Sequence, residues 1–92
     1  MLTYEKARRI GIDACIDKLG RDFVMKYKDS ATSGCGDRGD HVYCYVGVND
    51  KPELVPDEGL VLTSNDPFPY IARCTVGFLD GEVTYLNCIL PS

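Results

Sequence analysis

The sequence has no tryptophan, a single histidine and no Cys-x-x-Cys pair. It has no Asn-x-Ser/Thr acceptor site, and its longest uncharged apolar run, residues 42–48, is far too short to span a bilayer. The first nine residues lack the apolar core of a signal peptide. Lysine and arginine form no stripe and the net charge is −4, so we expect neither nucleic acid nor a membrane as a partner.

The composition is that of an ordinary folded protein. The 92 residues are 45% apolar and 26% charged, and they suffice for one domain spanning residues 1–92. The cysteines are Cys15, Cys35, Cys44, Cys74 and Cys88. Their number is odd and three lie in apolar segments, which is typical of free thiols that pack as small hydrophobes. We therefore expect a reducing compartment, the cytoplasm, although a disulfide between strands stays open.

Residues 3–19 have the apolar periodicity of an amphipathic helix. Thr3 is a suitable N-terminal cap and Gly20 a suitable stop. Gly11 lies near the centre of the apolar arc, although glycine costs about 1 kcal/mol relative to alanine in a helix. We expect a close approach of the helix to a flat surface, such as a sheet, to compensate for this cost.

Alternating apolar residues predict strands in the rest of the chain. These strands are residues 23–28, 41–49, 70–79 and 82–90, with a short edge strand at 60–62. A Gly/Ser/Asp-rich loop is expected at 30–40 and an acidic loop at 49–58. Asp80-Gly81, between two alternating runs, predicts a hairpin with a two-residue turn.

That turn pairs Leu79 with Glu82 and so assigns each residue of the hairpin to a face. The face that we expect to lie under the helix carries Tyr70, Ala72, Cys74, Val76, Phe78, Val83, Tyr85, Asn87 and Ile89. The opposite face is polar at one end, and its apolar end consists of Ile71, Leu86, Cys88 and Leu90.

The order of elements predicts an α+β fold, with one N-terminal helix packed on one face of a four- to five-stranded antiparallel meander. One helix covers only one face of such a sheet. The other face is therefore solvated, covered by the chain's own loops or covered by a partner. The layout resembles cystatin-like and nuclear transport factor 2-like proteins in architecture alone, and architecture says little about function.

One glycine-rich loop contains the residues that could carry chemistry. Cys35 could act as a nucleophile, with His41 as its base and Asp40 or Asp37 orienting the imidazole. Residues 34–39 match Gly-x-Gly-x-x-Gly, but they precede a strand, whereas a phosphate-binding loop opens a helix. Cys35, His41 and Cys44 leave a zinc ion without a suitable fourth ligand, so we expect no metal and no cofactor.

Other residues are suited to binding. Tyr43 and Tyr45 alternate with the valines of their strand, and tyrosine is enriched at binding surfaces because it offers a large area with a polar tip. The acidic loop could attract a basic protein. The candidate binding residues are therefore Tyr43, Tyr45, Asp57, Glu58, Ile71, Leu86 and Leu90.

The two ends of the chain carry a resemblance. Residues 1–7, Met-Leu-Thr-Tyr-Glu-Lys-Ala, resemble the Met-Ile/Leu-Thr-Tyr-x-x-Ala opening of a small bacterial family that includes immunity proteins of polymorphic toxin systems. The Pro-Phe-Pro-Tyr-Ile segment at 67–71, followed by Asp-Gly-Glu-Val at 80–83, is similar to that family's proline-led final hairpin. This sequence lacks the family's tryptophan and the Gly-Asn before the proline. The resemblance implies a cytosolic protein that binds and blocks a partner without catalysis.

Two functions follow as expectations. The first is a small cytoplasmic binding protein, not an enzyme, that uses an open sheet face and acidic loops to bind another protein or a second copy of itself. The alternative is a small enzyme or ligand-binding module with a pocket between helix and curved sheet, near Cys35 and His41.

Overall fold

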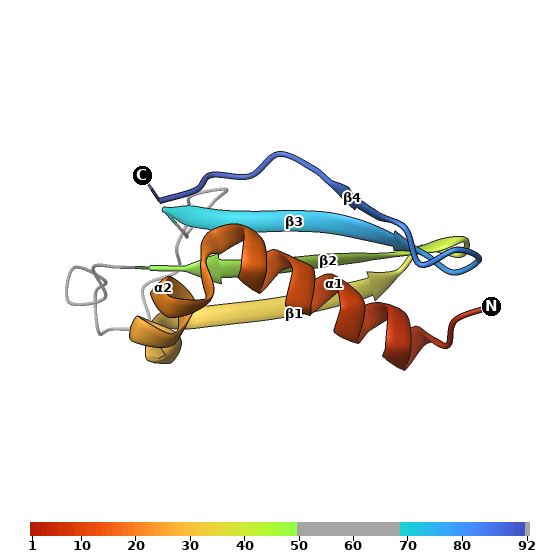
Figure 1. Ribbon diagram of the computed structural model, residues 1–92, viewed down its shortest axis with the longest axis horizontal. Coiled ribbons are helices and arrows are strands. Elements are labelled where there is room, and N and C mark those ends of the chain that lie inside the picture. The colour runs from red at the N-terminus through yellow and green to blue at the C-terminus, as the bar shows by residue number, and fades with distance from the viewer. Residues whose placement is uncertain (50–68, 92) are drawn as a thin grey trace, which may run out of the picture.

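The computed structural model describes residues 1–49 and 69–91 (Figure 1). In chain order the elements are α1 (Tyr4–Leu19), α2 (Arg21–Lys26), a 3-10 turn (Lys28–Ser30), β1 (Ala31–Asp37), β2 (His41–Val48), β3 (Tyr70–Gly77) and β4 (Val83–Tyr85). The short strand expected at 60–62 and most of the acidic loop, including Asp57 and Glu58, lie outside the described residues.

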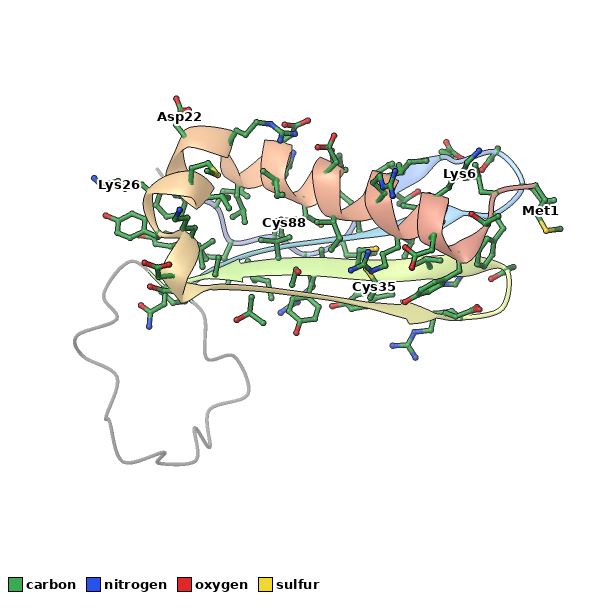
Figure 2. All side chains as sticks on the ribbon, turned by 90° about the horizontal axis from the view of Figure 1, so that it is seen from below. Met1, Lys6, Asp22, Lys26, Cys35 and Cys88 are labelled. Atoms are coloured by element: carbon green, nitrogen blue, oxygen red, sulfur yellow. The ribbon has the colours of Figure 1, made fainter. Side chains whose placement is uncertain are left out.

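The four strands form one antiparallel sheet in the order β1-β2-β3-β4. Helix α1 crosses this sheet and α2 lies near the start of β1 (Figure 1). In the view turned by 90°, both helices lie on the same side of the sheet (Figure 2). The predicted α+β architecture is thus confirmed, with a second, short helix in addition.

Helix α1 begins and ends where its sequence predicts. The Thr3 hydroxyl accepts a hydrogen bond from the Lys6 N–H at 3.2 Å, and Gly20 ends the helix with a φ of 106°. The residues of α1 that are buried follow one another at intervals of four, and they are Ala7, Gly11, Cys15 and Leu19. A Cβ on Gly11 would lie only 2.9 Å from Cys44 Cβ, so the expected close approach of the helix to the sheet is confirmed.

The core fills the space between α1 and the facing side of β2 and β3. Alternate residues of these strands are buried there, namely Val42, Cys44, Val46, Val48, Ala72, Cys74 and Val76. The predicted valine face of the strand that begins at His41 is therefore confirmed. Each buried valine stabilises the fold by roughly 1.5 kcal/mol or more relative to an exposed one.

The predicted strand at 23–28 is wrong, because the segment forms α2 and the turn after it. Its apolar residues satisfy a helical spacing as well as an alternating one. The rings of Phe23 and Tyr27, four residues apart, lie 5.2 Å from each other, and Phe23 also meets the ring of Tyr70 edge-on at 5.3 Å. Met25, which alternation would bury, is 61% exposed.

The loop predicted at 30–40 is also wrong over most of its length, because residues 31–37 form the edge strand β1. Each of these seven residues is paired with one of β2, from Ala31 opposite Val48 to Asp37 opposite Val42. Glycine and serine have low strand propensity. Pairing with β2, a strand that the sequence predicts strongly, therefore stabilises the strand conformation of β1, which its own residues do not favour.

The β3–β4 hairpin has a longer turn than its Asp-Gly signal predicts. Val76 pairs with Val83, and the Gly77 N–H donates to the Glu82 carbonyl at 3.1 Å, so four residues form the turn. Asp80 accepts from the Glu82 N–H at 2.9 Å and stabilises this turn. The register differs from the predicted one by two residues, which leaves the faces unchanged because side chains alternate with a period of two.

After β4 the faces do change, because the chain contains one extra residue there. Cys74 pairs with Tyr85, whereas Ile71 pairs with Ile89, so three residues of β3 oppose four of the returning segment. Ile89 therefore shares the face of Ile71, away from the helices, and Cys88 packs against the core. The predicted faces of Cys88 and Ile89 are thus wrong.

Candidate functional site

The side of the sheet turned away from α1 and α2 carries aromatic and cationic groups. Tyr43 and Tyr45 lie on it as predicted, with ring centroids 6.3 Å apart. The Arg38 guanidinium carbon lies 5.7 Å from the centroid of the Tyr43 ring, within range of a cation–π contact. Burial raises the pKa of Tyr43, so its hydroxyl is a hydrogen-bond donor at neutral pH.

Apolar side chains lie on the same face at the β4 side, with Arg73 of β3 between Tyr45 and Leu86. The Leu86 N–H donates to the Arg73 carbonyl at 2.9 Å, which continues the β4 register and puts Leu86 on the same face as the tyrosines. Leu86 is 43% exposed and Ile89 is 48% exposed. We call Tyr43, Tyr45, Leu86 and Ile89 the open-face patch.

The other predicted members of the apolar end differ in exposure. Ile71 is 6% exposed, so it is not available to a partner, whereas Leu90 is 41% exposed. Ile89 was not among the predicted binding residues. The extra residue that turns Ile89 to this face cannot be recognised from the alternation of apolar and polar residues in the sequence. Arg38 was missed as well. Its signal in the sequence, a position next to a turn glycine and five residues before Tyr43, is weak.

The structure separates the residues proposed for nucleophilic catalysis. His41 Nδ1 lies 2.6 Å from an Asp40 carboxylate oxygen, so the imidazole and its expected acid come together. Cys35, however, pairs with Cys44 and faces α1, whereas His41 begins β2 on the opposite face. Figure 2 shows Cys35 on the helix side of the sheet. Cys35 and His41 thus have the sheet between them.

Four thiols cross the interior as a row. Cys35, Cys44 and Cys74 occupy paired positions on three neighbouring strands, and Cys15 approaches them from α1. The distance between sulfur atoms is 3.0 Å for Cys35 and Cys44, and 3.6 Å for Cys15 and Cys74. All five cysteines of the chain are free thiols.

The buried thiols of Cys15 and Cys44 are poor nucleophiles. A hydrogen bond to Cys74, together with burial, raises the pKa of Cys15, and burial raises the pKa of Cys44. Both therefore remain largely protonated at neutral pH, which makes them slow nucleophiles and weak metal ligands. Within residues 1–49 and 69–91, no group of three His, Cys, Asp or Glu side chains is arranged to hold a metal ion.

The Gly-x-Gly-x-x-Gly segment at 34–39 lies in β1 and in the turn that follows it. It opens onto β2 and not onto a helix, so its backbone does not form a phosphate-binding helix terminus.

Comparison with known proteins adds no relative, since no protein-family model, curated protein or solved structure matches this chain. Neither helix in the part of the chain that the structure describes is long and apolar enough to cross a membrane.

Proposed function

We propose that this protein is a cytoplasmic, non-catalytic binding module that recognises another protein through its open-face patch. The observation that carries the proposal is the position of both helices on one side of the sheet. The other side has no helix among the described residues to cover Tyr43, Tyr45, Leu86 and Ile89.

The chemistry of this face is that of a protein interface. Tyrosine and arginine are enriched among the residues that dominate binding energy, and here Arg38 lies against the ring of Tyr43. Leu86 and Ile89 add apolar area that a partner would remove from water, at about 25 cal/mol per Å². A net charge of −4 favours a basic partner, because opposite charges accelerate association.

An immunity-type role is the specific form of this proposal. The resemblance at the two chain ends implies a protein that blocks a toxin by binding it, and such a role requires a surface rather than an active site. The separation of Cys35 from His41 by the sheet supports a non-catalytic reading over the alternative of a small thiol enzyme.

A homodimer is the competing occupant of the open-face patch. Two copies joined by a two-fold axis would bury the same residues on each. Size-exclusion chromatography with light scattering distinguishes the two, because a monomer at micromolar concentration leaves the patch free for a different protein.

The proposal is tested with variants of the patch. The native protein, Tyr45→Ala and Leu86→Asp are immobilised and exposed to extract from the producing cells. The control is Met25→Asp, which changes an exposed apolar side chain on α2, on the helix side. We expect a partner that native protein and control retain and that both patch variants bind about tenfold more weakly or lose. Equal retention by all four proteins would refute the proposal.

A further inference from the structure

We propose that the groove between α1 and β1 binds an extended peptide segment of a partner, which adds to the sheet as a strand beside β1. This site lies on the helix side and at the β1 edge, so it is distinct from the open-face patch. Its existence does not depend on the open-face proposal.

The first support is the direction of the β1 backbone groups. The Ser30 carbonyl accepts from Asn49 at 3.2 Å, and the Arg38 N–H donates to His41 at 2.9 Å, so even-numbered residues face β2. In an antiparallel pair the hydrogen-bonding residues alternate. Ser33, Cys35 and Asp37 consequently direct their N–H and C=O groups outward, away from β2.

These outward groups form a ready template for another strand. Sheet order leaves β1 at the edge, and no other strand of the described residues pairs with its outer side. Natural edge strands are usually protected by lysine, proline or a bulge. β1 has none of these, and its side chains are small, with Asp37 at its end as the one charged residue.

The second support is a groove along the same strand. α1 lies mainly over β2 and β3, so part of the helix-facing side of β1 is left uncovered (Figure 1). Two adjoining hollows of about 200 and 140 Å³ result. Their apolar walls are Ile12, Ile16, Val24, Ala31 and Val46.

The size of the hollows favours side chains over a whole small molecule. Pockets for small ligands typically measure about 300–1,000 Å³, which is more than either hollow. A strand added beside β1 would point every second side chain toward α1, because paired residues share a face. The residues opposite Ala31 and Ser33 would thus enter the groove, where Ile12 and Ile16 favour apolar groups.

Charge specifies one end of the peptide. Arg8 and Arg9 line the hollow that lies farther along β1, and Arg8 makes an exposed contact of 3.6 Å with Glu5. Asp13 in the same hollow is already paired with Arg21 at 2.6 Å. An acidic residue is therefore favoured there. For a strand antiparallel to β1 it stands at the N-terminal end, opposite Cys35, followed by apolar residues at alternate positions opposite Ser33 and Ala31.

The test uses an acetylated, amidated heptapeptide, Asp-Thr-Val-Thr-Val-Thr-Val, titrated into isotope-labelled protein and followed by NMR. We expect saturable shifts at the amides of Ala31, Ser33 and Cys35. The same composition rearranged as Asp-Val-Val-Val-Thr-Thr-Thr must bind at least about tenfold more weakly, because its apolar groups do not alternate. Replacing the peptide's Asp by Lys is expected to weaken binding about fivefold.

Backbone pairing is tested on the peptide, where no variant can unfold the protein. N-methylation of the third and fifth residues removes the N–H groups that face β1 and is expected to weaken binding about tenfold, at roughly 1 kcal/mol net for each hydrogen bond. N-methylation of the second and fourth residues leaves those bonds intact and serves as the matched control.

Protein variants give an independent readout. Arg8→Glu is expected to remove the preference for Asp over Lys in the peptide. Lys18→Glu is the control and should keep that preference, because the Lys18 side chain lies over the ring of Tyr85 in β4. Tyr45→Ala and Leu86→Asp are expected to bind the peptide normally, so failure of one site is distinguishable from failure of the other. Absence of binding at millimolar peptide, equal binding of the rearranged peptide, or shifts confined to the open-face patch would each overturn the proposal.

Discussion

The sulfur atoms of Cys35 and Cys44 lie 3.0 Å apart across β1 and β2. Because even-numbered residues of β1 form the hydrogen-bonded pairs, this pair occupies a non-hydrogen-bonded position, where Cα atoms are about 4.5 Å apart. Disulfides bridge Cα atoms about 4.4–6.8 Å apart, so the two residues could be joined without moving the backbone. Cys35 is half-buried, which gives an oxidant access to one member of the pair.

We predict that oxidised glutathione joins Cys35 to Cys44. Both thiols lose their protons, one sulfur–sulfur bond forms, and each glutathione disulfide is reduced to two glutathione molecules. The intact mass falls by two hydrogen atoms, and a peptide map identifies the bridge. The closed loop of about ten residues should raise the free energy of unfolding by roughly 2–3 kcal/mol.

Cys15 and Cys74 are the internal control for this reaction. Their sulfur atoms are 3.6 Å apart, but both side chains are fully buried, so an oxidant reaches neither of them. We expect them to remain reduced in the folded protein. Cys35→Ser must abolish the bridge, and a map that joins Cys15 to Cys74 instead would contradict the prediction.

Gly11→Ala is predicted to destabilise the protein despite the better helix propensity of alanine. The added methyl group would collide with Cys44 Sγ and lie 3.1 Å from Val76 Cγ2. Overpacking of a core typically costs about 1–3 kcal/mol, which exceeds the roughly 1 kcal/mol gained in propensity. Urea unfolding measures the difference. Gly36→Ala, whose Cβ would meet only Arg38 Nε at 3.9 Å, is the matched control and should not destabilise.

Alkaline pH is predicted to destabilise the fold through the buried thiol of Cys44. Burial raises the pKa of Cys44 in the folded state, so above about pH 9, the ordinary thiol pKa, the unfolded chain binds fewer protons than the folded one. The hydrogen bond between Cys15 and Cys74 raises the pKa of Cys15 and lowers that of Cys74, so the effects of these two thiols on stability oppose each other. The contribution of Cys44 is therefore complete below about pH 9 and falls above it, by up to about 1.4 kcal/mol per pH unit. Urea titrations under reducing conditions between pH 7 and 11 give the slope.

A variant assigns that slope to its cause. Cys44→Ala removes the raised thiol, so its stability should fall less steeply above pH 9 than that of the native protein, even though it starts from a lower value. Parallel curves for the two proteins would show that another group controls the alkaline transition.

Helix α1 and strand β2 could be predicted because their signals are local. Burial of Ala7, Gly11, Cys15 and Leu19 follows from helical spacing alone, and the alternating valines of His41–Val48 specify a strand in any context. The packing of Gly11 against the sheet followed from its cost in a helix. For these elements, propensity, pattern and packing all favour the same structure.

Strand β1 and helix α2 could not be predicted, since their conformations depend on distant residues. The glycine-rich β1 is ordered by its ladder with β2, and Phe23 of α2 packs against Tyr70, 47 positions away in the sequence. The candidate site was affected in the same way. Once β1 is known to be a strand, it follows that Cys35 and His41 occupy opposite faces and that a groove borders α1. The sequence alone did not reveal that strand.

Tyr45 and Gly34 are predicted to be energetically coupled across the open face. A Cβ on Gly34 would lie 2.6 Å from Tyr45 Cε1 and 3.0 Å from its Cζ, because the ring packs directly on the glycine. Gly34→Ala therefore displaces the ring and should destabilise the native protein. In a Tyr45→Ala background the ring is gone, and the same change should stabilise by roughly 0.5–1 kcal/mol, as alanine loses less backbone entropy. The double-mutant cycle should thus give a coupling energy above about 1 kcal/mol, whereas additive effects would show that the ring moves away from Gly34 at no cost.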